Sequence, residues 1–234
     1  MTYLLSHALD TLMESTYDSM ANRLVEKLKS LPRDARIIIA IAGIPGSGKS
    51  TLSQQVIQRV NLRMKADVGR VLPMDGFHLY KSELDKMENP SMAHARRGAH
   101  FTFNPNKLLL LVRTLRERPH DIVMAPSFDH AIGDPVENDV DIGPQHRIIL
   151  LEGLYLHTAT PPWSDIYALC DERWFIQIPL EFARDRIGKR HVATGLAPTL
   201  EMAWLRWDEN DRLNGEYVLR TRLPATFEIM SICT

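Results

Sequence analysis

The chain of 234 residues lacks the features that mark several protein classes. Its two cysteines, Cys170 and Cys233, fit no metal-binding spacing, so we expect free thiols in a reducing, cytoplasmic compartment. No apolar run approaches the length of a membrane span, and we expect no membrane association. The formal net charge of -1 at pH 7 argues against a nucleic-acid partner, because such binders usually carry a basic excess.

The first residues also lack a targeting signal. Acidic residues at positions 10, 14 and 18 precede any Lys or Arg, which argues against a secretory or mitochondrial leader. Apolar residues recur every three to five positions over residues 3–31, which predicts one helix, or two if Thr11 and Glu14 form a capping box. We expect residues 1–35 to form a helical extension packed on a main domain of residues 36–234, or to pack across a homodimer.

What the chain does contain is a phosphate-binding signature. Residues 37–52 read as a buried strand, a glycine-rich turn that fits G-x-x-x-x-G-K-[ST], and the start of a helix. Glycines let several backbone N–H groups point at one anion, and the helix N-terminus adds a positive potential there. The alternative is a glycine-rich turn with a lysine at this position by chance, but such a turn would not need a strand before it and a helix after it. The predicted nucleotide-binding residues are Gly43, Ile44, Pro45, Gly46, Ser47, Gly48, Lys49, Ser50 and Thr51.

This pattern assigns specific chemistry to the end of the loop and to two later acidic residues. Lys49 would reach the β- and γ-phosphates of ATP, and the Ser50 hydroxyl would ligate Mg²⁺. Glu152 ends an apolar strand at 147–151 and is a second candidate Mg²⁺ ligand. Asp75 ends another short strand and is the candidate to orient and deprotonate an acceptor hydroxyl; the alternative is a turn aspartate beside Gly76.

Further candidates lie on a basic helix and in two polar segments. Arg186 and Arg190 are four residues apart and share a helical face, as in a lid over phosphates; the alternative is a basic surface helix. The polar, irregular segment 80–104 has the composition of a small-molecule site or of a solvated loop. A strand at 121–125 runs into polar residues at a strand end, and residues 133–141 should form a hairpin or exposed loop.

The alternation of strands and helices predicts an α/β fold of three layers, with a mostly parallel central sheet and a helical lid. At this point four motifs, in this order, resemble the uridine kinase, phosphoribulokinase and bacterial-type pantothenate kinase family of P-loop kinases. They are the loop at 43–50, Asp-Gly-Phe-His at 75–78, Leu-Glu-Gly at 151–153, and the arginine-bearing helix. The stretches 97–103 and 207–214 look most like a poorly characterised sub-branch of ATP-dependent kinases of the sugar or nucleoside type.

The resemblance implies ATP and Mg²⁺ as cofactors and a role for each candidate. The implied catalytic residues are Lys49, Asp75, Arg186 and Arg190, the metal ligands are Ser50 and Glu152, and the acceptor pocket is lined by Asp75, His78, Arg97, Phe103 and His130. Uridine kinases carry Ser-Phe-Tyr after the aspartate, whereas Gly-Phe-His follows Asp75 here, which argues against uridine itself.

The expected activity is transfer of the γ-phosphoryl group of ATP to a hydroxyl of a small metabolite, such as a sugar, a nucleoside or a pantothenate-like compound. The alternatives are an ATPase or GTPase switch and a nucleotide-binding regulator without an acceptor. A GTPase would carry Asn-Lys-x-Asp, but Asn106-Lys107 is followed by two leucines. A mechanical ATPase usually has an acidic pair where this chain has Glu152-Gly153. The acceptor, the oligomeric state and the residues that hold the adenine stay open.

Overall fold

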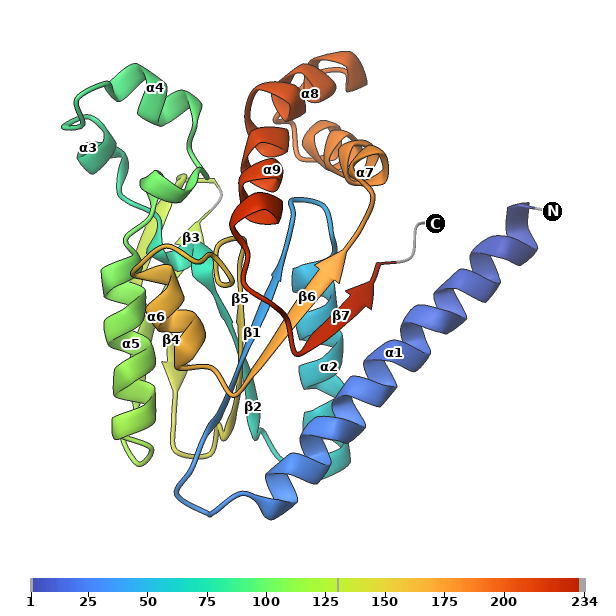
Figure 1. Cartoon of the computed structure of the whole chain (residues 1–234), viewed down its shortest axis with the longest axis vertical. Helices are drawn as coiled ribbons and strands as arrows, with labels where there is room; N and C mark the ends of the chain where they lie inside the picture. The colour runs from blue at the N-terminus through green and yellow to red at the C-terminus, as the bar shows by residue number, and fades with distance from the viewer. Residues whose placement is uncertain (1, 130, 232–234) are drawn as a thin grey trace.

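The computed structural model describes residues 2–129 and 131–231, with side chains from Leu12 onward. The chain alternates strands and helices as expected (Figure 1). In order, the elements are α1 (Thr2–Ser30), β1 (Ile37–Gly43), α2 (Lys49–Met64), β2 (Gly69–Pro73), the 3-10 turn η1 (Met74–Phe77), α3 (Lys81–Leu84), α4 (Pro90–Ala95), the 3-10 turn η2 (His100–Thr102), α5 (Pro105–Glu117), β3 (Val123–Asp129), β4 (Asp134–Ile142), β5 (Ile148–Glu152), α6 (Trp163–Ala168), β6 (Glu172–Gln177), α7 (Leu180–Ala193), α8 (Leu200–Arg206), the π-helical turn η3 (Trp207–Asp211), α9 (Arg212–Thr221) and β7 (Phe227–Met230).

Five strands of the described chain form a parallel sheet in the order β2-β5-β1-β6-β7. Strands β1 and β5 are buried along their whole length, as their continuous apolar runs predict for central parallel strands. Glu152, the last residue of β5, pairs in register with Ile41 of β1 and Pro73 of β2. The sheet therefore brings the loop after β1, the segment after β2 and the end of β5 to one edge.

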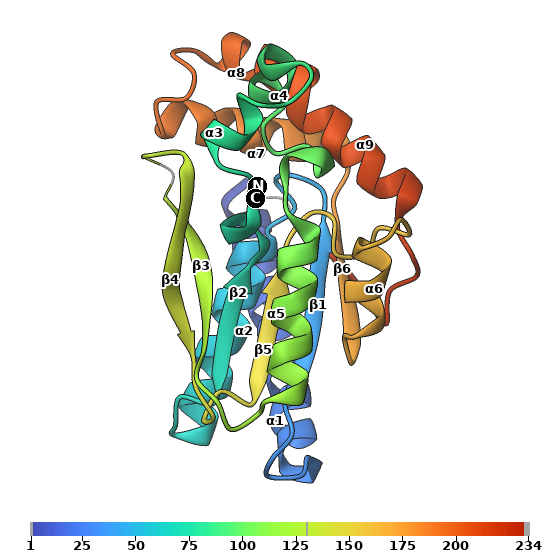
Figure 2. The ribbon, with the colours of Figure 1, turned by 90° about the vertical axis from the view of Figure 1, so that its left-hand side faces the viewer.

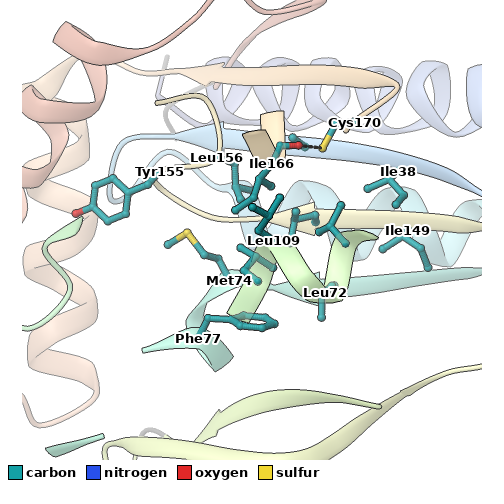
Figure 3. Packing of buried hydrophobic residues seen from close by; sticks show 14 of the residues in the cluster. Ile38, Leu72, Met74, Phe77, Leu109, Ile149, Tyr155, Leu156, Ile166 and Cys170 are labelled. Carbon is teal, nitrogen blue, oxygen red and sulfur yellow. Dashed lines mark hydrogen bonds between the residues drawn. The ribbon is translucent and has the colours of Figure 1, made fainter. Parts of the chain in front are cut away.

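Helices cover both faces of this sheet, which gives the expected three layers. On one face α1 and α2 pack against β1, β5 and β6. On the other face the core residues of α5 and α6 meet apolar residues of the strands and of η1 (Figure 3). Helices α7, α8 and α9 lie beyond the carboxyl ends of the strands, over the edge where the candidate residues gather (Figure 1).

The N-terminal segment is one unbroken helix, so the alternative of two helices is wrong. Thr11 and Glu14 lie within α1, where the backbone N–H groups already have helical partners and need no cap. Tyr17 and Leu24 are buried in the same apolar cluster as α2. Arg59 of α2 also pairs with Glu14. Helix α1 therefore packs within the chain through apolar and charged contacts.

The segment after α5 departs from the expected parallel arrangement. Strands β3 and β4 form a separate antiparallel hairpin, which confirms the hairpin expected near 133–141 (Figure 2). Because β3 is outside the central sheet, residues 126–129 are not a parallel strand end. Within segment 80–104, expected to be irregular, α3, α4 and η2 form short helical turns.

Two further features of the described residues concern helix character and the cysteines. None of the described helices combines the length and the apolar character that crossing a membrane requires. Cys170 is a free, buried thiol whose pKa burial raises to about 12, so it stays protonated and unreactive. Cys233 lies outside the described residues.

Candidate active site

The loop between β1 and α2 folds as its glycines require. Gly46 and Gly48 have φ of 79° and 94°, in the left-handed region that favours glycine. A Cβ on Gly46 would come within 2.8 Å of the Ala183 carbonyl oxygen, and one on Gly43 within 2.7 Å of the Ile176 carbonyl oxygen. Glycine is thus needed both for the turn and for the close approach of α7 and β6.

Lys49 begins α2 and lies near the charged groups of Glu152 in β5, Asp75 in η1 and Arg190 in α7. Its ammonium donates to the carbonyl oxygen of Ile44 at 3.1 Å. Burial lowers the pKa of Lys49 to about 8, while the charges of Glu152 and Asp75 act to raise it. The three predicted residues therefore lie within electrostatic range of one another, at the same edge of the sheet.

Ser50 and Glu152 form the candidate metal site. The Ser50 hydroxyl donates to Glu152 Oε1 at 3.1 Å, so a hydroxyl and a carboxylate oxygen stand side by side. Burial raises the pKa of Glu152, and a cation would relieve that cost. The nearby Ser47 Oγ is buried without a hydrogen-bond partner among the described residues. This all-oxygen set fits Mg²⁺, and the described chain brings together no group of three His, Cys, Asp or Glu for another metal.

Helix α7 carries Arg186 and Arg190 on one face, as the i,i+4 spacing predicts. Both line a pocket of about 470 Å³ that also borders the loop from Gly46 to Thr51. Arg186 Nη1 donates to Ser231 Oγ at 2.8 Å and approaches the Gly46 carbonyl oxygen at 3.4 Å. The charge of Arg190 also acts on the pKa of Lys49 and of Glu152.

On the other side of Lys49, η1 carries Asp75 and is followed by His78. A Cβ on Gly76 would come within 2.1 Å of the Pro126 carbonyl oxygen, so only glycine lets η1 pack against β3. His78 Nδ1 is 2.8 Å from the carbonyl oxygen of Asp75. The His78 ring lies 3.9 Å from that of Phe103 and 4.6 Å from that of Phe128, measured between centroids.

Arg97 lies at the same aromatic group. Its guanidinium is 5.6 Å from the Phe128 ring centroid and donates to the Leu79 carbonyl oxygen and to Asp134 Oδ1, at 2.9 and 3.1 Å. Its Nε and Nη1 have no hydrogen-bond partner among the described residues. Both nitrogen atoms are buried, so these spare donors lack the hydrogen bonds that buried N–H groups normally make. The structure thus gathers His78, Arg97 and Phe103, whereas His130 lies outside the described residues.

Hydrogen bonds of the buried Asn210 and Asn214 side chains connect segment 80–104 to the helices above the sheet. Arg96 donates to Asn210 Oδ1 and Asn214 Oδ1, each at 2.9 Å. Asn210 returns a bond to the Arg97 carbonyl oxygen at 3.0 Å. Asn210 belongs to η3, and π-helical turns of this kind often mark functional sites. The stretch 207–214, singled out in the sequence, therefore contacts segment 80–104.

Some pocket residues were not predicted from the sequence. Met13, Glu14 and Tyr17 of α1 line the pocket beside the loop. Tyr17 belongs to the apolar stripe of α1, and such a stripe by itself indicates packing only. Phe128 and Asp134 complete the surroundings of Arg97, but only the β3–β4 pairing brings them there.

A glycine loop between a parallel strand and a helix, carboxylates at the ends of two neighbouring strands and an arginine-bearing helix above them are the features of a P-loop kinase. The sequence pattern of the Phosphoribulokinase / Uridine kinase family matches residues 38–183. The chain belongs to this family.

Individual relatives agree with this membership. The candidate uridine kinase C227.14 of Schizosaccharomyces pombe is 43% identical over 204 residues, which cover 87% of this chain and 86% of that protein. The ATP-dependent kinase-like protein notR' of Aspergillus versicolor is 47% identical over 154 residues, covering 64% of this chain and 90% of that protein.

Solved structures show the same fold. A candidate fructose transport system kinase from Silicibacter sp. TM1040 superposes with a TM-score of 0.78 at 30% identity, over 89% of this chain and 98% of that one. YFH7 from Saccharomyces cerevisiae has a TM-score of 0.80 at 21% identity, over 92% of this chain and 98% of that one.

Proposed function

We propose that the protein transfers the γ-phosphoryl group of ATP to a hydroxyl group of a small metabolite. The observation that carries this proposal is the convergence of Asp75 and Glu152 on Lys49 at the carboxyl edge of the sheet. A nucleotide switch needs the lysine and a metal-binding carboxylate. A second carboxylate on the acceptor side is useful when a hydroxyl group has to be deprotonated.

In the proposed reaction the acceptor oxygen forms a bond to the γ-phosphorus as the bond from that phosphorus to the β,γ-bridging oxygen breaks. The hydroxyl proton passes to the Asp75 carboxylate, and ADP leaves with the electron pair of the broken bond. Lys49, the loop N–H groups, Arg186 and Arg190 neutralise the negative charge of the phosphates. Ser50 and Glu152 would hold Mg²⁺, which supplies further charge neutralisation when bound.

The acceptor side supports a small polar compound of the sugar, nucleoside or pantothenate-like type. The rings of His78, Phe103 and Phe128 can form apolar walls, and the spare donors of Arg97 can bind oxygen atoms. The names of two relatives make uridine and fructose the first compounds to test. The Gly-Phe-His sequence after Asp75, in place of the Ser-Phe-Tyr of uridine kinases, argues against uridine itself.

The test is a screen of a metabolite mixture with Mg²⁺ and ATP, followed by mass spectrometry. We expect one class of compound to gain a phosphate, with ADP formed in equal amount. The matched Asp75→Asn variant should bind ATP and form neither product at a comparable rate. ADP release that does not depend on any acceptor would identify an ATPase instead, and ATP binding without ADP release would favour a regulator.

A further inference from the structure

The strand order indicates on which side of the loop each end of a bound nucleoside triphosphate lies. Glu152 and Asp75 follow β5 and β2, which lie on one side of β1. The γ-phosphate has to reach that side, because the proposed acceptor base and metal ligand are there. Strands β6 and β7 lie on the other side of β1. The nucleoside part of the donor therefore extends from the loop toward β6, β7 and α7.

The pocket of about 470 Å³ lies on that second side. Ile176 near the end of β6, Ser231 just after β7 and Arg186 of α7 form part of its wall. Besides the phosphate loop, another part of the wall comes from a segment far away in sequence, namely Met13, Glu14 and Tyr17 of α1. None of these α1 residues lies within the range 38–183 that the family pattern matches.

Tyr17 is held firmly in this wall. It is 8% exposed and belongs to the apolar cluster beneath the sheet. The guanidinium of Arg59 lies 5.2 Å from its ring centroid. Burial raises the pKa of the Tyr17 hydroxyl, so the side chain stays neutral, and the charge of Arg186 acts on it from across the pocket. A neutral aromatic ring fixed by packing is a suitable surface for a flat heterocycle.

We infer that α1 completes the nucleotide site, with the base of the donor nucleotide packed against Tyr17 and Met13. This inference rests on the proposed function and deepens it. The aromatic ring offers stacking area, and the thioether of Met13 adapts its shape to the ring that it contacts. Helix α1 then acts as a determinant of donor affinity, besides covering α2.

The test separates the base from the phosphates by using two ligands. Affinities for ATP and for inorganic tripolyphosphate, each with Mg²⁺, are measured by calorimetry. In Tyr17→Ala we expect about a tenfold weaker affinity for ATP, the scale of one base–aromatic contact, and an unchanged affinity for tripolyphosphate. Met13→Ala should show a smaller loss of the same kind, and Tyr17→Phe, which keeps the ring, should bind ATP like the parent chain.

Val25→Ala provides the matched control. Val25 has the same 8% exposure, on the same helix and in the same apolar cluster, but it does not line the pocket. It should lower thermal stability and leave both affinities unchanged. Met13 is only partly buried, so we expect Met13→Ala to fold. Its affinity for ATP therefore tests the contact between α1 and the base even if Tyr17→Ala does not fold.

The outcomes distinguish this inference from the proposed function. ATP binding that is unchanged in both wall variants, or a loss that is equal for ATP and tripolyphosphate, would overturn the inference while the kinase proposal stands. A parent chain that binds neither ligand would overturn both.

Discussion

The two halves of the proposed site, one for the ATP phosphates and one for the acceptor, are built in different ways. The donor half is a short contiguous segment, from Gly43 to Thr51, held between a buried strand and a helix that belong to the main core. The acceptor half brings together η1, segment 80–104 and the β3–β4 hairpin, which lies outside the central sheet. A local motif therefore shapes one half, and contacts between distant segments shape the other.

The bonds in the two halves differ as well. In the donor half, Lys49 donates to a carbonyl of its own loop, and Ser50 to the neighbouring carboxylate of β5. In the acceptor half, many links are ion pairs or hydrogen bonds at the surface, such as Tyr80 to Glu137 and Lys107 to Glu137. We therefore expect variants of the donor half to weaken the binding of both ATP and tripolyphosphate. Variants of the acceptor half should change only the binding or the reaction of the acceptor.

The largest effect is expected at Lys49. Lys49→Met keeps most of the side-chain volume and removes the charge that is proposed to bind the triphosphate. We expect weaker binding of both ATP and tripolyphosphate, and a loss of turnover of about a thousandfold or more, because one preorganised charge is removed from the reaction centre. Calorimetry and a coupled ADP assay measure the two quantities. ATP affinity equal to that of the parent chain would contradict the assigned role of the loop.

Asp75→Asn tests whether a residue of the acceptor half changes turnover without changing the affinity for ATP. The amide keeps the shape of the side chain but cannot accept the acceptor proton as a carboxylate does. Turnover should fall by about two to four orders of magnitude, the scale of general-base catalysis, while ATP affinity stays near that of the parent. A variant with full turnover on a verified acceptor would remove Asp75 from the mechanism.

The low pKa of Lys49 predicts a pH dependence that is confined to the donor half. In the free protein Lys49 loses its proton near pH 8, and bound phosphates would raise its pKa. ATP binding is then linked to proton uptake above that pH. Affinity for ATP should be insensitive to this group below about pH 8 and fall by up to about tenfold per pH unit above it. Titrations in buffers of different ionisation enthalpy measure the uptake, and an affinity that rises with pH would refute the assignment.

The smallest effect is expected at Arg97. Arg97→Lys keeps a cation beside Asp134 but cannot reproduce the spare donors Nε and Nη1. We expect the KM for the acceptor to rise about tenfold, the cost of roughly one hydrogen bond to a charged group, and the KM for ATP to stay unchanged. Arg70→Lys is the matched control, since Arg70 also pairs with the hairpin but has Asp141 as its partner. Equal effects in the two variants would indicate a structural role.

The same contrast explains how much could be predicted from the sequence. The donor half follows from one motif, because glycine, lysine and serine act there through backbone geometry and neighbouring positions. The burial of β1 and β5 could be predicted too, since continuous apolar runs are typical of central parallel strands. Glu152 then follows from its place at the end of such a strand.

The rest depends on pairings that a single sequence does not reveal. Phe128 and Asp134 reach Arg97 only because β3 and β4 pair with each other instead of joining the sheet. Tyr17 lies beside the phosphate loop only because α1 folds back along α2. In both cases the residue types are those of ordinary packing, and the long-range contact gives them a further role.

The charged contacts of the β3–β4 hairpin also make the acceptor half sensitive to the ionic strength of the solution. Glu137, near its turn, forms an ion pair with Lys107, and Asp134 forms one with Arg97. The Debye length falls from about 8 Å at physiological ionic strength to about 3 Å in 1 M salt, so concentrated salt weakens partly exposed ion pairs of this kind. Added salt should therefore weaken the contacts of the acceptor half first. The affinity for the proposed acceptor should then fall at salt concentrations at which the sheet and the lysine loop are still intact.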